Sequence, residues 1–272
     1  MSDLDRGLPA SEPSPRKRAR ERWLSALPFL AIFVLWQAAS ALGWSNAYLL
    51  PSPLRVARAL ILSAESGELA RHSIVSILRV AEGFGIAAAL ALPLAALVSL
   101  APALSSALDP LLSFLRNIPP LALVPVLILW FGIGEASKLA LIVLAAFFPI
   151  FMGAVTGLGS VDPRLMEMGR SVGFSRWRIL ARVMVPESVP SIANGLRLGL
   201  GYSWRALVGA EMVAASAGLG YWILDSEQMA RIDLVFAGIL VIGFLGIILD
   251  RGAFAVASRL LPWARLDAQW RA

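Results

Sequence analysis

The sequence predicts an all-α integral membrane protein with about six transmembrane helices. Hydrophobic residues make up 58% of the 272-residue chain and charged residues only 15%, which is too little polar content to cover a soluble globule. The mean hydropathy of +0.74 supports the same conclusion. The apolar residues fall into runs of about 20, the length that spans a bilayer core. Most basic residues lie in blocks that flank these runs, as expected for the cytoplasmic side of a membrane.

Composition also excludes several functions. The chain has no cysteine and one histidine, His72, so thiolate catalysis and Cys/His metal sites are excluded, and we expect His72 to have a solvated or capping role. The basic blocks lack interleaved aromatic residues, so the net charge of +6 fits membrane topology better than nucleic-acid binding. Neither lysine, Lys17 or Lys138, follows a glycine, so no G-x-x-x-x-G-K-[ST] phosphate loop exists. We therefore predict no cofactor, and any energy must come from a partner or an ion gradient.

The N-terminal quarter is predicted to contain a tail, one span and a connection. Residues 1–22 are rich in Pro and Ser and end in a basic block, which is typical of a disordered cytoplasmic tail. Residues 23–42 are long and apolar enough for the first span. Ala39-Ser40-Ala41 imitates a signal-peptidase site, but the apolar run is longer than usual for a signal peptide, so we favour an uncleaved span. Residues 43–72 should form a periplasmic connection with an interfacial helix.

Residues 73–250 are predicted to be a core of five further spans. In the second span, residues 73–100, Arg79 and Glu82 lie three residues apart on one helical face, which favours an ion pair between them. The other expected segments are a short turn at 101–110, a third span at 111–131, a tight turn at 132–137, a fourth span at 138–158, a polar loop at 159–190, a fifth span at 191–215, a polar connection at 216–233, a sixth span at 234–249 and a basic cytoplasmic tail at 251–272.

Two of these spans carry residues that are unusual in an apolar helix. Pro119 and Pro120 should bend or break the third span, and the freed carbonyls must then be satisfied by protein or by a watery path. In the fifth span Glu211 is an intramembrane carboxyl, for which pairing with Arg205 is the favoured interpretation. The fifth span should also pack closely against its neighbours, because it carries glycines at 195, 199, 201 and 209.

The polar loop at 159–190 has the pattern of two short helices. Asp162 followed by Pro163 predicts a helix start, with a carboxylate cap and a proline at the first helical position. The first helix should run to about Ser171 and be broken by Gly173. A second amphipathic turn or two should follow, until the prolines at 186 and 190 stop the helical hydrogen bonding.

The spacing within this loop resembles the EAA loop of ABC importer permeases, in which E-A-A, a glycine and I-x-L-P stand at fixed intervals. Glu167-Met168-Gly169 is followed by Gly173, six residues after the glutamate, and then by Val183-Met184-Val185-Pro186. The intervals match, although Met, Gly and two valines replace the usual Ala, Ala, Ile and Leu. The resemblance implies a coupling helix that docks into a cleft of a cytosolic ATPase. The implied coupling residues are Glu167, Met168, Gly169, Arg170, Gly173, Val183, Val185 and Pro186.

The resemblance extends over nearly the whole chain after about Leu30. Residues 115–138, 147–151 and 218–221 are similar to permeases for aliphatic sulfonates, and Asn117 with its neighbours favours these over relatives that serve taurine, nitrate or other small nutrients. The family implies a type I importer core that is a transport subunit and not an enzyme. It also implies a permease homodimer, a cytosolic ABC ATPase dimer and a periplasmic or lipid-anchored substrate-binding protein.

The distribution of basic residues predicts the orientation. With the N-terminus inside, the inner segments hold 15 basic residues, and the outer segments hold 5 when Lys138, the first residue of the fourth span, is counted with the turn before it. This asymmetry favours the bacterial inner membrane with both termini and the loop at 159–190 in the cytoplasm.

For an anionic cargo, positive groups along the path would attract the substrate. The candidates for the translocation path are Arg116, Asn117, Arg197, Arg205 and Glu211, although arginines near span ends more often reach for lipid headgroups. Two alternatives remain beside the importer. A secondary transporter would carry protons on Glu82 or Glu211, whereas an intramembrane enzyme would need a reactive dyad in the spans, and none stands out.

Overall fold

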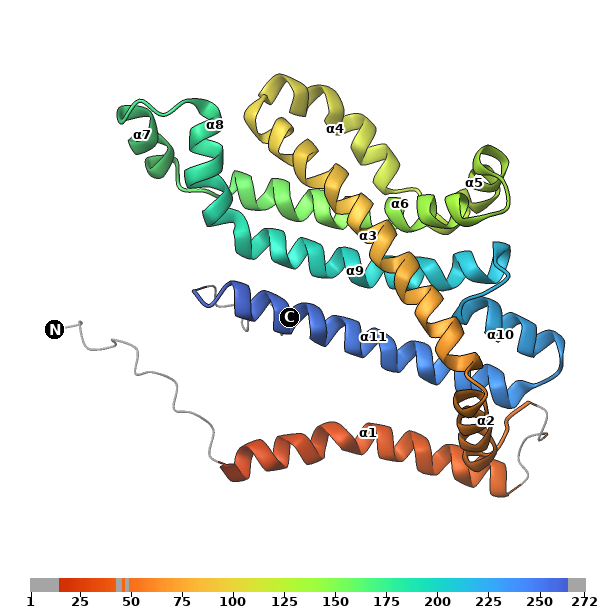
Figure 1. Cartoon of the computed structure of the whole chain (residues 1–272). Helices are drawn as coiled ribbons and strands as arrows, with labels where there is room; N and C mark the ends of the chain where they lie inside the picture. The colour runs from red at the N-terminus through yellow and green to blue at the C-terminus, as the bar shows by residue number, and fades with distance from the viewer. Residues whose placement is uncertain (1–14, 43–45, 47–48, 264–272) are drawn as a thin grey trace. The chain divides into compact units, whose positions relative to one another are not determined.

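The computed structural model describes residues 15–42, 46 and 49–263, and over these residues it contains helices and no strand (Figure 1). The chain divides into two compact units, residues 1–58 and 59–272.

The first unit contains α1 (Pro15–Ala41) and the beginning of α2 (Pro53–Glu65). α1 begins within the predicted disordered tail, so that prediction is wrong for residues 15–22; residues 1–14 lie outside the described part. The segment PRKRARER consists mostly of strong helix formers and has proline in the first turn, so a helix that starts there is favourable. Trp36 Nε1 donates a hydrogen bond to the carbonyl of Pro51 at 2.9 Å. The helix predicted in the 43–72 connection is α2.

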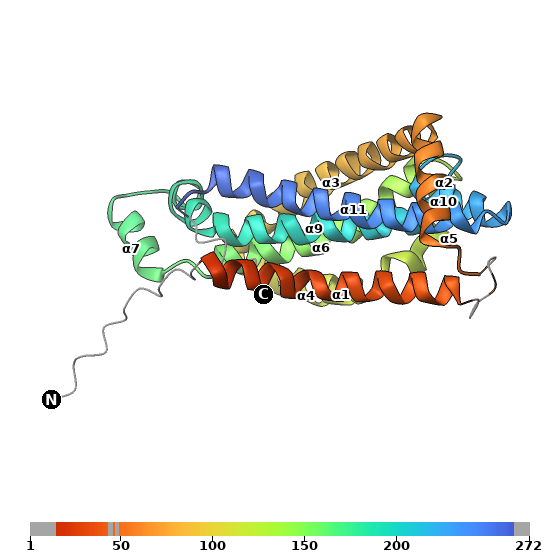
Figure 2. The same ribbon diagram turned by 90° about the horizontal axis from the view of Figure 1, so that it is seen from below.

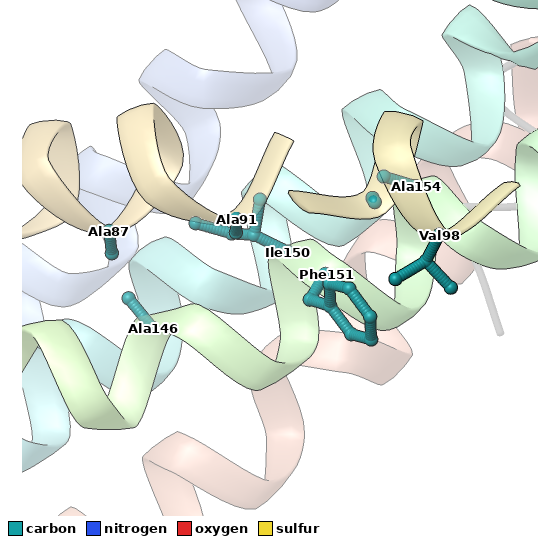
Figure 3. Close-up of a cluster of buried hydrophobic side chains, with 8 residues drawn as sticks. Ala87, Ala91, Val98, Ala146, Ile150, Phe151 and Ala154 are labelled. Atoms are coloured by element: carbon teal, nitrogen blue, oxygen red, sulfur yellow. The ribbon is translucent and has the colours of Figure 1, made fainter. Parts of the chain in front are cut away.

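The second unit is built on α3 (Glu68–Leu100), α6 (Glu135–Gly159) and α9 (Val185–Ala214). α3 presents alanines at every fourth position, Ala87, Ala91 and Ala95, to α6, where they pack with Ala146 and Ile150 (Figure 3). All five side chains are fully buried. Small side chains at this spacing let two helix backbones approach closely, which is how membrane helices associate without a hydrophobic driving force.

α6 and α9 are also joined through small residues. Gly153 and Gly157 on α6 face Gly195 and Ser191 on α9, and a methyl group added at Gly153 would lie 2.6 Å from the Cα of Gly195. Side by side in both views, α6 and α9 form the centre of the unit (Figures 1 and 2). The close packing predicted for the glycines of α9 is therefore confirmed at Gly195.

The predicted third span is a bent pair of helices. α4 (Pro102–Arg116) is followed by a short 3-10 turn (Pro120–Leu123) and α5 (Val124–Phe131), with an 86° bend between them. The break at Pro119 and Pro120 is confirmed. The turn predicted for 101–110 is wrong, because only Ala101 is extended, with φ −127° and ψ 90°, and Pro102 occupies the first helical position, where its missing N–H costs nothing.

The C-terminal third is more helical than predicted. The expected polar connection at 216–233 contains α10 (Leu219–Gln228), and α11 (Ile232–Leu260) continues into the predicted tail. Just before α11, Arg231 donates hydrogen bonds to Asp233 at 3.0 and 3.1 Å, which raises the pKa of its guanidinium. α10 and α5 lie at one end of the α6, α9 and α11 group, and the loop at 159–190 lies at the opposite end (Figures 1 and 2).

Over the described residues, three helices are long and apolar enough to cross a membrane, α3, α6 and α11, and the bent α4–α5 pair makes a fourth candidate. α9 has 30 residues, which is long enough, but it carries four charged side chains. The six predicted spans correspond in order to α1, α3, the α4–α5 pair, α6, α9 and α11.

Candidate coupling and transport sites

The loop at 159–190 begins with the predicted helix α7 (Pro163–Ser171). The carboxylate of Asp162 accepts a hydrogen bond from the backbone N–H of Arg164 at 2.9 Å, and Pro163 fills the first helical position. Both features satisfy the needs of a helix N-terminus, where backbone N–H groups lack partners within the helix.

α7 ends in a Schellman motif centred on Gly173. The N–H of Gly173 bonds to the carbonyl of Arg170 at 2.9 Å, and the N–H of Phe174 bonds to the carbonyl of Gly169 at 3.0 Å. Gly173 has φ +79°, in the left-handed region that glycine enters without a Cβ penalty, and nothing lies within 4 Å of the place where a Cβ would stand. Its role here is therefore set by backbone conformation and not by lack of space.

The second short helix continues into α9 without interruption. α8 (Arg176–Ile179) leads into one π-helical turn (Leu180–Met184), in which the N–H of Val185 bonds to the carbonyl of Leu180, and α9 follows directly. The prediction that Pro186 and Pro190 stop the helix is wrong. Pro186 lies in the first turn of α9, just after the wider π turn has changed the hydrogen-bond pairing, and Pro190 is accommodated inside the helix. The loop and the fifth span therefore share one continuous helical rod.

Two contacts hold α7 against α8. Gly169 is buried, and a methyl group there would lie 3.2 Å from Cγ1 of Ile179, so an alanine at the third position of the E-M-G sequence would require Ile179 to shift by a few tenths of an ångström. The ring of Phe174 lies beneath the guanidinium groups of Arg178 and Arg182, at 5.6 and 5.8 Å from its centroid. The two helices thus form a small unit that packs through Ile179 on the end of the bundle.

The surface of this unit exposes three large apolar side chains among its arginines. Met168, Val172 and Trp177 are 65%, 73% and 60% exposed. Glu167 is also exposed, and within the described residues its carboxylate makes no ion pair. Of the other implied coupling residues, Val183 and Val185 lie on the π turn and at the start of α9.

A largely buried charge cluster lies at the other end of α3, α6 and α9, away from the α7–α8 unit. The guanidinium of Arg79 donates two hydrogen bonds to Glu135, each 2.6 Å, and one to Glu211 at 2.8 Å. Lys138 adds a 2.7 Å ion pair to Glu135. The predicted pairs Arg79–Glu82 and Arg205–Glu211 are both wrong: Arg79 joins α3 to acids on α6 and α9, distant in sequence, which a search for neighbours along one helix cannot find.

The same cluster caps the N-terminus of α10. The N–H groups of Gly218, Leu219 and Gly220 bond to His72 Nδ1, Ser76 Oγ and a Glu211 carboxylate oxygen, at 3.0, 2.9 and 3.0 Å. A Cβ at Gly218 would collide with the Glu211 carboxylate.

His72 is buried, with 1% of its surface exposed, so the capping role is confirmed and the solvated role is wrong. The sequence feature that indicated a capped helix start at this place is the Gly218-Leu219-Gly220-Tyr221 turn.

The candidate path residues are not brought together. Arg197 forms a bidentate ion pair with Asp250 at 2.7 and 2.9 Å and ties α9 to α11. Glu211 is buried in the charge cluster. The amide of Asn117 donates to the carbonyl of Ser113 at 2.6 Å, which caps the end of α4. Arg116 and Arg205, in contrast, are exposed, and Arg116 lines a groove.

This architecture is that of a membrane permease core. The chain belongs to the family of inner membrane components of binding-protein-dependent transport systems, whose family model matches residues 83–262. It is therefore an ABC importer permease, a multi-pass inner-membrane transport subunit and not an enzyme, in a family that works with a separate ATPase and a substrate-binding protein. The described residues hold no group of three or more His, Asp or Glu side chains that could bind a metal ion.

Particular relatives and a solved structure support this assignment. The chain is 37% identical to the putative aliphatic sulfonates transport permease protein of Bacillus subtilis, over 90% of each chain. It is 34% identical to the taurine transport system permease protein of Escherichia coli, over 91% of this chain and 94% of the relative. A bacterial ABC transporter involved in the import of alginate matches with a TM-score of 0.58 and 16% identity, over 89% of this chain and 96% of that one, which shows the type I importer fold alone.

Proposed function

We propose that this chain is the permease of an ATP-driven importer of small organic anions, with aliphatic sulfonates as cargo. It works as a homodimer, with both termini and the α7–α8 unit in the cytoplasm. The proposed coupling role rests on the structure of the α7–α8 unit. Its exposed apolar side chains, Met168, Val172 and Trp177, offer a docking surface, and its second helix is continuous with α9.

The continuity of α8 and α9 supports a mechanical role. A partner that seats on Met168, Val172 and Trp177 would move α8, and the π turn and α9 would move with it, because no loop intervenes to absorb the displacement. α9 packs along α6 through glycines, so the motion would reach the centre of the permease as a rigid displacement.

The choice of sulfonates rests on the relatives and on charge. The names of the Bacillus subtilis and Escherichia coli relatives include aliphatic sulfonates and taurine, which are both sulfonates. Arg116, which lines a groove, and Arg205 are both exposed, and their positive charges would attract an anion. A permease for nitrate or another small anion of the same family is the alternative.

The coupling role is tested with a charge at the tip of the loop. Gly173→Asp and Gly173→Asn place side chains of equal size at a position with open space, and both residue types adopt positive φ more readily than others do. We expect the aspartate to weaken capture of the ATPase from solubilised native membranes and to reduce uptake of an alkanesulfonate, while the asparagine variant retains more of both.

Gly159→Asp is the matched control. Gly159 is exposed at the end of α6, again with nothing within 4 Å of a Cβ, so it adds the same charge to the same side outside the α7–α8 unit. Uptake and ATPase capture by this variant should match the wild type. Normal uptake by Gly173→Asp, with the protein present in the membrane, would refute the docking role.

A further inference from the structure

A groove lies between α4, α6 and α9, and Arg116 is one of its lining residues. It has a volume of about 620 Å³ and is mostly apolar, with Phe148, Met152, Leu198 and Tyr202 among its lining residues. A second groove of about 460 Å³ shares Met152 and Leu198 with it and continues along α6 and α9. The lining of the second groove is more polar, with Thr156, Ser191 and Asn194. The two grooves therefore form one continuous surface whose lining becomes more polar from the first groove to the second.

One arginine lines the first groove, and a second lies beside one of the lining residues. Arg116 contributes to its wall, with Nη1 at 3.9 Å from the sulfur of Met152. The guanidinium of Arg205 lies over the Tyr202 ring, 4.8 Å from its centroid. Asp109, about two turns earlier on the same face of α4, lines a small adjoining cavity of about 80 Å³ together with Arg116, and no ion pair forms between them.

These two arginines differ from Arg79 and Arg197, which also lie in the long helices. Arg79 and Arg197 are held by carboxylates in bidentate or multiple contacts. Arg116 and Arg205 have a thioether, a backbone carbonyl and an aromatic ring as neighbours, and none of these neutralises their charge. Planar guanidinium donors in this state are suited to an oxyanion group.

We propose that this groove is a binding subsite for an organic anion with an alkyl part. Arg116, with Arg205 at the margin, binds the acid group, and Met152, Leu198 and Tyr202 contact the alkyl part. This inference rests on the proposed function and narrows its substrate class: an inorganic anion such as nitrate would use the arginines and leave the apolar wall without a role. The second groove, with its hydroxyl and amide groups, binds the acid group after it leaves the first groove.

The test measures binding and does not require transport. The permease is purified from native membranes with whatever ATPase accompanies it, and its thermal stabilisation is titrated with straight-chain alkanesulfonates from methanesulfonate to hexanesulfonate. A chain that lies along the apolar wall should strengthen binding by about twofold to fourfold for each added methylene, the range from half to full burial. Sulfate, which has no alkyl part, should stabilise least.

Two variants separate the two parts of the site. Arg116→Gln should weaken binding of every sulfonate by about tenfold, the lower end for a hydrogen bond to a charged group, and leave the dependence on chain length unchanged. Leu198→Ser should flatten the dependence on chain length and leave methanesulfonate binding unchanged. Arg58→Gln, an exposed arginine of α2 outside the groove lining, should have no effect on either.

Two results would show that the groove is not the proposed subsite. Equal binding by wild type and Arg116→Gln, or wild-type binding that does not rise with chain length, would overturn it. Absence of a co-purifying ATPase would refute the proposed coupling and leave this binding measurement intact, so the two failures are distinguishable.

Discussion

The Arg79–Glu211 pair should be strongly coupled in stability, because its carboxylate has no access to solvent. The Glu211 side chain is 0% exposed and that of Arg79 is 8% exposed. Replacing Arg79 by Met leaves a buried carboxylate with only Ser76 and the Gly220 N–H as partners, and we expect a loss of about 3–5 kcal/mol of unfolding free energy. Loss of the ion pair between Arg79 and Glu135 contributes about 1 kcal/mol at most to this loss of unfolding free energy, because the Glu135 side chain is 59% exposed.

A double-mutant cycle isolates the pair. In Arg79→Met with Glu211→Gln no unpaired charge remains, so the double variant should be more stable than the sum of the single effects by about 2 kcal/mol. The measurement is unfolding in mixed micelles with increasing dodecyl sulfate, followed by circular dichroism. Arg197→Met with Asp250→Asn is the matched control, since those side chains are 25% and 48% exposed and should couple by less than about 1 kcal/mol. A coupling below about 0.5 kcal/mol at Arg79–Glu211 would refute the reasoning.

Two further predictions concern glycines. Gly153→Ala should destabilise the permease by about 1–3 kcal/mol, because its methyl group meets the backbone of Gly195, which cannot move aside as a side chain could; Gly159→Ala, with open space, should be neutral in the same unfolding assay. Gly173→Val should open the α7–α8 unit, since a β-branched residue at φ +79° costs about 1–2 kcal/mol or more. Faster tryptic cleavage in the loop would report the opening, and cleavage no faster than in Gly173→Asn would contradict it.

The local features of the coupling loop could be predicted because they depend on short-range chemistry. The Asp162 cap, the proline at 163 and the turn at Gly173 each follow from the side chains at those positions, and all three are confirmed. The continuation of α8 into α9 could not be predicted. A proline normally marks the end of a helix, and whether a π turn accommodates it depends on packing that is not local in sequence.

The charge cluster shows the same limit at a larger scale. Arg79 and Glu82 satisfy the spacing rule for a helical pair, yet Arg79 bonds to acids 56 and 132 residues away. Helix spacing predicts which residues share a face, but not which other helix that face meets. The capping partners of α10 were missed for the same reason, although the two glycines at 218 and 220 were visible in the sequence.

The seams between α3, α6 and α9 are rich in alanine and glycine, which have no side-chain rotamers. Because these residues cannot repack by changing χ angles, the three helices have few ways of fitting together and cannot slide past one another without losing contact. The groove wall is different, since Met152, Leu198 and Tyr202 all have alternative rotamers. We therefore expect the shape changes of a transport cycle to concentrate at that wall, with the α3–α6–α9 body moving as a single piece behind it.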